Sequence, residues 1–208
     1  MVSHAQRLTP DGSWPTAHGP RPTAHWQTLA RREVADCRPW VRLWAEDVRL
    51  PDGRVIADFA AIDLPDYVVV VALAADGRVV VERNYKHGPR RVCLNLPAGY
   101  LDPGEEPLAA ARRELLEETG YAADEWAYLG SFANDGNRGC GRGHFYLARG
   151  ARRVAEPDAG DLEEIAVDLL PLDALARATR DGEVAVLSIA AAIGLAALAV
   201  GDGRGAPA

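Results

Sequence analysis

The sequence predicts an α/β (α+β) fold in which a central mixed β-sheet lies between helices, with a small antiparallel strand unit ahead of it. Segments of strand character and segments of helical character follow one another in mixed order, which is typical of a sheet covered by helices. Two β-branched runs flank Asp76-Gly77, a strong hairpin signal. A segment that begins at Pro107 and stops at Gly120 has the end signals of a helix.

The length of 208 residues fits one domain with an N-terminal appendage. Residues 1–25 carry four prolines and little apolar periodicity, so we expect a flexible leader there. We expect the strand unit over residues 26–62, the main domain over 63–200 and a flexible tail over 201–208.

The strand unit is expected to contain three short strands. Residues 40–44 and 48–50 form the first two, and a Pro-Asp-Gly turn at 51–53 leads to the third at 55–59. In the main domain, the expected strands are 67–74, 78–83, 92–96, 126–132, 144–148 and 165–169, and the expected helices are 107–118, 171–180 and 184–200.

Composition and charge exclude several classes of protein. The net charge of −7 and the pI near 5.3 argue against binding to a nucleic-acid backbone. The three cysteines are far apart in the sequence, so reduced thiols in a cytoplasmic protein are expected rather than a disulfide framework or a zinc site. The N-terminus lacks the apolar core of a signal peptide.

Residues 184–200 are uncharged over their whole length. This run is slightly short for a membrane span and contains Ser188 and Gly194. We interpret it as an alanine-rich core helix, and we expect no membrane partner.

The most informative segment is residues 99–121, GYLDPGEEPLAAARRELLEETGY. A glycine loop carrying Glu105 precedes a helix on which Glu114, Glu117 and Glu118 share one face. Carboxylates at this density repel one another unless a cation neutralises them. Hard oxygen ligands suit Mg²⁺ or Mn²⁺, and such ions typically act on phosphate oxygens. The pattern predicts metal-dependent chemistry on a phosphate ester or anhydride, whereas the bland alternative is an acidic, solvated helix.

This segment matches the Nudix box, G-x5-E-x7-R-E-U-x-E-E-x-G-U, at every fixed position. The fixed residues are Gly99, Glu105, Arg113, Glu114, Glu117, Glu118 and Gly120, and the apolar slots hold Leu115 and the less typical Tyr121. Seven fixed residues at fixed spacing make a specific signal. The chain therefore resembles the Nudix hydrolases, whose fold is a mixed sheet between helices.

The resemblance implies a metal site and its ligands. Glu114 and Glu118 would be the main ligands of Mg²⁺, for which Mn²⁺ can substitute, with Glu117 binding directly or through water and the carbonyl of Ala98 adding a further oxygen. Glu105 would hold the loop or a water near the metal. Arg113 would pair with a box carboxylate and fix its rotamer.

The wider layout resembles the ADP-ribose pyrophosphatase branch of the family. The shared features are Trp26, Trp40, Asp52-Gly53, residues 85–88 and residues 96–99. This resemblance implies a homodimer with an exchanged strand unit, and aromatic side chains that hold adenine. Trp40 and Trp44 are the candidates, with strand-core tryptophans as the alternative. Arg83 and Lys86 either contact phosphates or are exposed charges at a strand end.

Two loops add further candidates. The acidic loop 158–164 would supply the general base, for which Glu163 is the first choice and Asp161 and Glu164 are the alternatives; a solvated loop is the other interpretation. The glycine-rich loop 133–143 would bring Arg138 and Arg142 to a terminal phosphate, unless it is a long flexible hairpin loop.

Some positions depart from the branch. Asn134-Asp135-Gly136 stands where a proline is usual, Asn95 where glutamate is frequent and Lys86 where arginine is common. The expected substrate is therefore ADP-ribose or a related nucleoside diphosphate sugar, with GDP-mannose, a dinucleoside polyphosphate or NADH as alternatives. The NADH signature SQPWPxS is absent. A nucleotide sensor without catalysis is the alternative of another class, although all the box glutamates are present.

Overall fold

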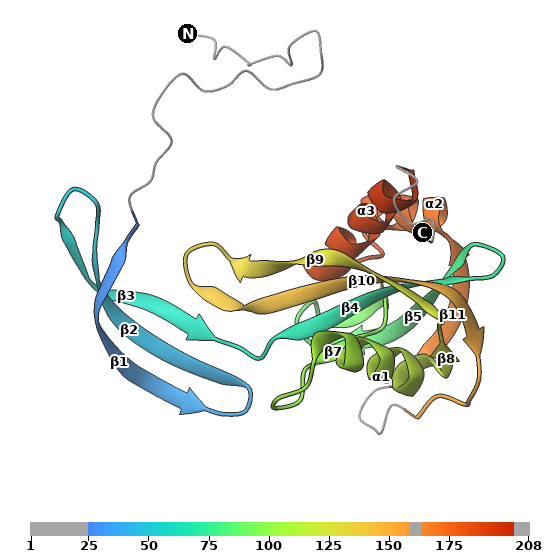
Figure 1. Cartoon of the computed structure of the whole chain (residues 1–208), viewed down its shortest axis with the longest axis horizontal. Coiled ribbons are helices and arrows are strands. Elements are labelled where there is room, and N and C mark those ends of the chain that lie inside the picture. The colour runs from blue at the N-terminus through green and yellow to red at the C-terminus, as the bar shows by residue number, and fades with distance from the viewer. Residues whose placement is uncertain (1–24, 159–163, 202–208) are drawn as a thin grey trace, which may run out of the picture.

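The computed structural model describes residues 25–158 and 164–201 (Figure 1). Except for His25 and Gly201, the expected leader and tail lie outside these residues. The strands are β1 (Gln27–Cys37), β2 (Val41–Arg49), β3 (Val55–Asp63), β4 (Tyr67–Ala74), β5 (Arg78–Lys86), β6 (Arg91–Asn95), β7 (Ala98–Tyr100), β8 (Tyr121–Ala122), β9 (Glu125–Asp135), β10 (Gly139–Arg153) and β11 (Ala166–Pro171). The helices are α1 (Pro107–Thr119), α2 (Leu172–Arg180) and α3 (Leu187–Gly201).

The strands form one mixed sheet in the order β1-β2-β3-β10-β4-β5-β11, with β6, β7, β8 and β9 paired alongside these strands. Strand β10 runs parallel to β3 and to β4, and the other pairs are antiparallel. The central strand β4 is buried on both faces over six consecutive residues, because helices cover both sides of it. The predicted mixed sheet is confirmed.

Alternate residues of β4 supply two separate apolar cores. Val69 and Val71 pack with residues of α2 and α3, among them Leu175 and Ile193. Val68 and Val70 belong to the other cluster, which includes Ala111 and Leu115 of α1. The sheet therefore lies between α1 on one face and α2 and α3 on the other, as the predicted sandwich requires.

Strands β4 and β5 pair at Leu73 and Val79, near the turn that joins them. Beyond that point, β4 pairs with β7 while β5 pairs with β6. Each strand thus takes a different neighbour as it leaves the turn. This divergence opens the sheet at the end where the box loop enters α1, and it positions the cavity described below.

Strands β1, β2 and β3 form an antiparallel unit that extends away from the sandwich (Figure 1). This unit meets the main sheet where Ile62 pairs with Gly139, and the Ile62 N–H donates to the Arg138 carbonyl at 3.0 Å. Every residue of β1 is exposed. The unit therefore rests on few contacts with the rest of this chain.

Most expected elements are present. The short strands β7 and β8 were not predicted, and three larger differences follow. Strand β1 was not predicted, because its sequence is rich in charge and lacks strict alternation. The two strands expected at 40–44 and 48–50 are one strand, β2, whose register shifts between Glu46 and Val48. The strand expected at 144–148 runs from Gly139 to Arg153, since a bulge at its start accommodates residues that look like a loop.

The apolar run near the C-terminus forms α3, and Ile189, Ala192, Ile193 and Ala196 are its buried residues. They pack on the sheet together with Val69 and Leu147, which supports the interpretation as a core helix. In the part of the chain that the structure describes, no helix is long and apolar enough to cross a bilayer.

Candidate active site

Helix α1 carries the box carboxylates, and both of its ends are determined by the sequence. Pro107 occupies the first turn, where a missing N–H costs nothing. Gly120 ends the helix at φ 74° and donates its N–H to the Leu116 carbonyl at 2.8 Å. Leu115 is fully buried against the sheet. This packing fixes the rotation of the helix and directs Glu114 and Glu118 toward the loop before it.

Arg113 is the centre of an ion-pair network. Its guanidinium contacts Glu105 through two nitrogens, at 3.0 and 2.8 Å, and also Glu114 at 2.7 Å and Glu117 at 3.2 Å. It donates to the Tyr100 carbonyl as well, at 3.1 Å. The two bonds to Glu105 have the geometry of a bidentate pair. Arg113 therefore ties the box loop to the helix.

The loop lies directly against the helix at Ala98 and Gly99. The Ala98 N–H donates to Glu118 Oε2 at 2.8 Å. A Cβ at position 99 would overlap the Glu114 carboxylate. Only glycine leaves space there, so Gly99 is needed to let the Glu114 carboxylate lie against the loop backbone.

The electrostatics of the site favour a bound cation. Burial, together with the nearby Glu82, raises the pKa of Glu118 to about 9, and burial raises the pKa of Glu114. The hydrogen bonds from Arg113 lower the pKa of Glu105. Two carboxylates that are costly to ionise therefore lie against the backbone of Ala98 and Gly99, and a divalent ion would offset their charge.

The donor set fits a hard divalent ion. The ligands expected from the sequence are the carboxylates of Glu114, Glu117 and Glu118 and the carbonyl of Ala98, all oxygen donors of the kind that Mg²⁺ takes. Among residues 25–158 and 164–201, no three acidic, histidine or cysteine side chains already form a metal cage. Arg113 holds two of the three helix carboxylates, and the Ala98 N–H holds the third.

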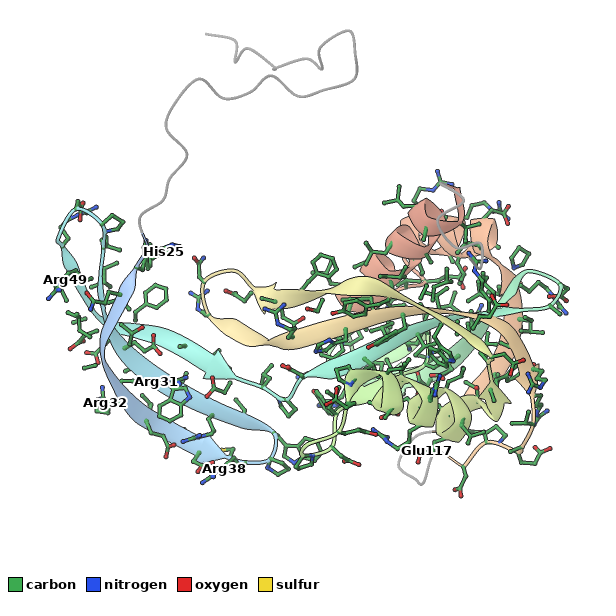
Figure 2. The ribbon with its side chains drawn as sticks, in the orientation of Figure 1. His25, Arg31, Arg32, Arg38, Arg49 and Glu117 are labelled. Carbon is green, nitrogen blue, oxygen red and sulfur yellow. The ribbon has the colours of Figure 1, made fainter. Side chains whose placement is uncertain are left out.

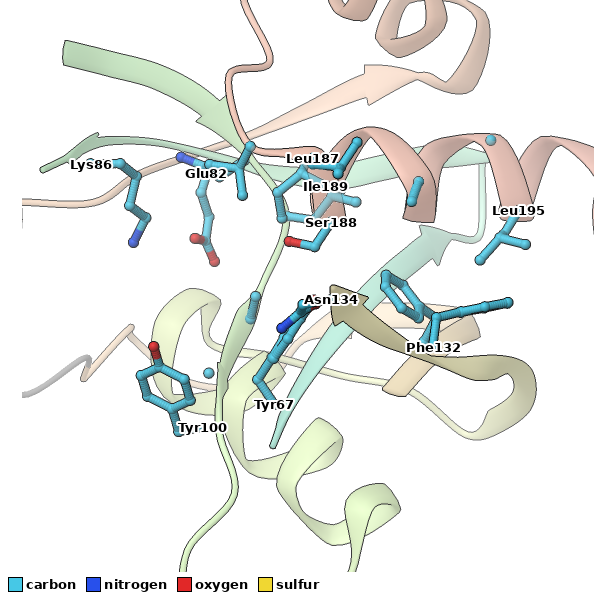
Figure 3. A pocket seen from close by; sticks show the side chains of 18 of the residues that line it. Tyr67, Glu82, Lys86, Tyr100, Phe132, Asn134, Leu187, Ser188, Ile189 and Leu195 are labelled. Atoms are coloured by element: carbon cyan, nitrogen blue, oxygen red, sulfur yellow. The ribbon is translucent and has the colours of Figure 1, made fainter. Parts of the chain in front are cut away.

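A cavity of about 930 Å³ opens beside these groups. Ala98, Gly99 and Glu118 line one part of it together with Glu82 and Lys86. Figure 3 shows Glu82, Lys86 and Tyr100 around that part, with Tyr67, Asn134 and Ser188 next along and Phe132 and Leu195 beyond them. The volume lies in the range of small-molecule sites.

The structure brings Lys86 to this cavity, whereas Arg83 points elsewhere. Lys86 lies close enough to Glu118 to lower the pKa of that carboxyl, although burial and Glu82 outweigh this effect. Arg83 pairs with Glu183 at 3.1 Å, and it is not among the residues that line the cavity.

The two candidate tryptophans lie on the strand unit, and neither lines the cavity. The guanidinium carbons of Arg31 and Arg42 lie 4.0 and 4.2 Å from the Trp44 ring centroid. The Trp44 indole N–H donates to Asp63 at 2.6 Å. These contacts occupy the surface on which a base would stack. Trp40 lies in the turn before β2, is 64% exposed, and approaches Tyr100 with 6.1 Å between ring centroids.

The segment 133–143 is mostly strand, so the expected glycine-rich loop is reduced to the tip of the β9–β10 hairpin. Arg138 lies at that tip, 3.6 Å from the carboxylate of Asp135. Arg142 donates to the Ser131 hydroxyl at 2.9 Å. Gly139, Cys140 and Gly141 all have φ between 57° and 83°, which produces the bulge. Neither arginine lines the cavity.

The acidic loop can be placed only in part, because Asp161 and Glu163 lie outside the described residues. The segment before it is tied to the box helix, since the Asp158 N–H donates to the Glu117 carbonyl at 2.8 Å. Glu164 is exposed where the described chain resumes. The acidic loop thus begins beside Glu117.

Sequence reasoning assigned no role to most residues of the cavity, among them Tyr67, Glu82, Phe132, Asn134 and Ser188. One of them left a signal, because Glu82 interrupts the apolar run of β5 and is 1% exposed. A charge within a buried strand is rare without a functional or structural reason. The others belong to ordinary strand and helix patterns.

The comparisons with known proteins agree with this geometry. The NUDIX domain model matches residues 63–187, which is more than half of the chain. The chain belongs to the Nudix family. It is a Nudix hydrolase, and the match covers the box, strands β4 to β11 and the part of the cavity lining that precedes Ser188.

Named relatives of this Nudix hydrolase differ in activity. A methanol dehydrogenase activator of Bacillus methanolicus is 34% identical over 132 residues, which are 64% of this chain and 70% of that protein. An ADP-ribose pyrophosphatase of Mycobacterium tuberculosis is 34% identical over 170 residues, 78% of each chain. A crystal structure of an ADP compounds hydrolase superposes with a TM-score of 0.73 at 21% identity, covering 86% of this chain and 96% of that one. That likeness supports the fold.

Proposed function

We propose that this Nudix hydrolase cleaves the diphosphate of ADP-ribose, or of a related nucleoside diphosphate sugar, to a nucleoside monophosphate and a sugar phosphate in a Mg²⁺-dependent reaction. One observation carries the proposal: the buried carboxylates of Glu114 and Glu118 contact the backbone of Ala98 and Gly99. This contact lies at one end of a cavity of about 930 Å³. The similarity to ADP-ribose pyrophosphatases supports the substrate class.

Each residue has a definite task in this proposal. Glu114, Glu118 and the Ala98 carbonyl would hold the ion, and Glu117 would bind it directly or through water. When bound, a divalent ion neutralises charge on the diphosphate and makes a water molecule more acidic. Arg113 positions the carboxylates through its bonds to Glu114 and Glu117.

Two further groups act on the reactants. Lys86 faces the cavity, and its ammonium would attract the substrate phosphates, which matters in a protein with a net charge of −7. For the general base we propose Glu163, with Asp161 and Glu164 as the alternatives. The link between Asp158 and Glu117 brings the start of this loop to the box helix.

We also propose that the protein is a homodimer that associates through its strand unit. Strand β1 is exposed at every residue and carries the apolar side chains of Leu29 and Val34, which are 40% and 51% exposed. Figure 2 shows Arg31, Arg32, Arg38 and Arg49 on this unit, far from Glu117. A second copy would cover this surface, and the molar mass in solution tests the idea.

A substrate panel tests the proposed function. The protein is incubated, with and without Mg²⁺, with each of ADP-ribose, ADP-glucose, GDP-mannose, diadenosine polyphosphates and NADH. A phosphatase then releases inorganic phosphate from the monophosphate products, and this phosphate is measured. The expected result is metal-dependent turnover that is fastest with ADP-ribose. If another member of the panel were hydrolysed faster, the substrate assignment would change, whereas the proposed metal-dependent hydrolysis would stand. No turnover of any member by folded protein would contradict the proposal and favour the sensor.

A further inference from the structure

Two polar residues lie buried where β5 and β6 pair, outside the box sequence. Glu82 and Asn95 are opposite each other in the register of the two strands, and they are 1% and 2% exposed. Val80, two residues before Glu82, packs in the same cluster as Leu115 of α1. Because side chains alternate between the two faces of a strand, Glu82 and Asn95 point to the face that α1 covers. Glu118 of α1 lies near Glu82, and all three residues line the cavity.

The amide of Asn95 is held in one orientation. Its Nδ2 donates to Asn84 Oδ1 at 2.5 Å and to the Cys93 carbonyl at 3.3 Å. A backbone carbonyl can only accept a hydrogen bond, so the amide nitrogen must face Cys93 and the amide oxygen must point away from it. Asn95 Oδ1 is buried and accepts no hydrogen bond from any residue in the described part of the chain. A buried acceptor without a donor is destabilising, so this oxygen favours a cation that binds in the cavity.

The charges around this part of the cavity favour more than one bound cation. Among the described residues, five glutamates either line the cavity or contact Arg113, namely Glu82, Glu105, Glu114, Glu117 and Glu118. The cationic groups among them are Lys86 and Arg113, so three negative charges remain when all five glutamates are ionised. Figure 3 shows the Glu82 carboxylate pointing into the cavity beside Lys86. One divalent ion at the box would leave one negative charge, and a second ion would offset it.

We propose that Glu82, Asn95 and Glu118 hold a second divalent cation, on the side of α1 that faces β5 and β6. Two carboxylates and an amide oxygen are hard donors of the type that Mg²⁺ and Mn²⁺ take, and water completes the shell because Mg²⁺ usually keeps several water ligands. The first ion keeps Glu114 and the Ala98 carbonyl, while Glu118 contributes to both ions. The inference deepens the proposed function, because it rests on the metal site at the box and adds an ion whose other ligands lie outside the box.

A titration with Mn²⁺ tests this inference, and the electron paramagnetic resonance signal of free Mn²⁺ reports how many ions each chain binds. The titrations use the full-length protein without substrate. Glu82→Gln removes a carboxylate, Asn95→Leu removes the amide oxygen at similar size, and Asn95→Asp replaces that oxygen with a charged one. The matched controls are Glu125→Gln and Asn137→Asp, because Glu125 and Asn137 are exposed and lie outside the cavity lining.

The wild type is expected to bind two Mn²⁺ ions per chain, one more tightly than the other. Glu82→Gln and Asn95→Leu should keep the tighter ion and raise the Kd of the weaker ion at least about tenfold. Asn95→Asp should lower the Kd of the weaker ion about tenfold, because a charged ligand binds a cation more tightly. Both controls should match the wild type.

Two results would overturn the inference. The first is a wild-type protein that binds a single Mn²⁺ ion per chain. The second is a Kd of the weaker ion that stays at the wild-type value in Glu82→Gln and in Asn95→Asp. These two variants are nearly equal in shape to the residues they replace, so they decide the question even if Asn95→Leu does not fold.

Failure of this inference is distinguishable from failure of the proposed function. The Mn²⁺ titration measures binding of the ion without any substrate, whereas the substrate panel measures hydrolysis. A wild-type protein that hydrolyses ADP-ribose but binds one Mn²⁺ ion would contradict the inference and leave the proposed function standing. A protein that binds two ions with the expected shifts in the variants, yet hydrolyses no member of the panel, would contradict the proposed function alone.

Discussion

Glu105 and Glu118 are two glutamates of one site with opposite electrostatic environments. Glu105 faces the guanidinium of Arg113, which lowers its pKa. Burial and the nearby Glu82 raise the pKa of Glu118, although the N–H that it accepts from Ala98 lowers it in part. The Glu105 carboxylate is therefore held as an anion by its ion pair, whereas ionisation of Glu118 is costly unless a cation binds beside it. The box spacing identified both residues, but only the fold reveals that Glu82 lies beside Glu118.

The raised pKa of Glu118 predicts how the stability of the metal-free protein depends on pH. A glutamate in the unfolded chain titrates near 4.5, and Glu118 in the folded protein titrates at about 9. Between these values the folded state binds more protons, so the free energy of unfolding falls as the pH rises. In EDTA, we expect a lower Tm at about pH 8.5 than at about pH 6.

Thermal unfolding of Glu118→Gln checks the source of this trend. The variant cannot ionise at position 118, so its Tm should decline less over the same pH interval. Glu125→Gln, at an exposed position of β9, should keep the wild-type decline. Identical declines in the wild type and in Glu118→Gln would show that another group causes the effect.

At the scale of helices and strands, the sequence patterns predicted the features that depend on neighbouring residues in the chain, such as the ends of a helix. The box helix ends within one residue of its expected limit, since Pro107 and Gly120 act through local backbone geometry. Strand β1 and the start of β10 escaped prediction because the first is rich in charge without strict alternation and the second is rich in glycine, although each pairs with its neighbour in the chain, β2 and β9. The cavity residues Tyr67, Asn134 and Ser188 come from three elements, so no local pattern could assemble them.

The close approach of β7 to α1 gives a prediction of its own. A methyl group at position 99 would overlap the Glu114 carboxylate, so Gly99→Ala should displace this ligand. We expect at least a hundredfold loss of Mg²⁺-dependent turnover, roughly the effect of losing one well-placed charged contact. Circular dichroism should report retained folding.

Gly88→Ala is the matched control for this change. Gly88 lies in the turn after β5, and a Cβ there meets nothing within 4 Å. The control should retain wild-type turnover. Similar losses in the two variants would mean that the effect is not specific to the contact between Gly99 and Glu114.

At the scale of the whole molecule, the fold concentrates its chemistry where the sheet opens. Strands β4 and β5 diverge after Leu73 and Val79, and the box loop, the end of β5 and the start of α3 all border that opening. The strand unit stands apart and meets the main sheet at Ile62 and Gly139. We therefore expect catalysis to reside in the sandwich, and the proposed association would occur through the strand unit.

The central claim is that the buried box carboxylates carry metal-dependent hydrolysis of a nucleoside diphosphate derivative. The most direct measurement is the rate of ADP-ribose hydrolysis by the wild type, Glu118→Gln and the control Glu125→Gln over a range of Mg²⁺ concentrations. We predict a loss of roughly a thousandfold in Glu118→Gln, wild-type rates in the control, and no turnover in EDTA. Undiminished, Mg²⁺-independent hydrolysis by Glu118→Gln would contradict the account.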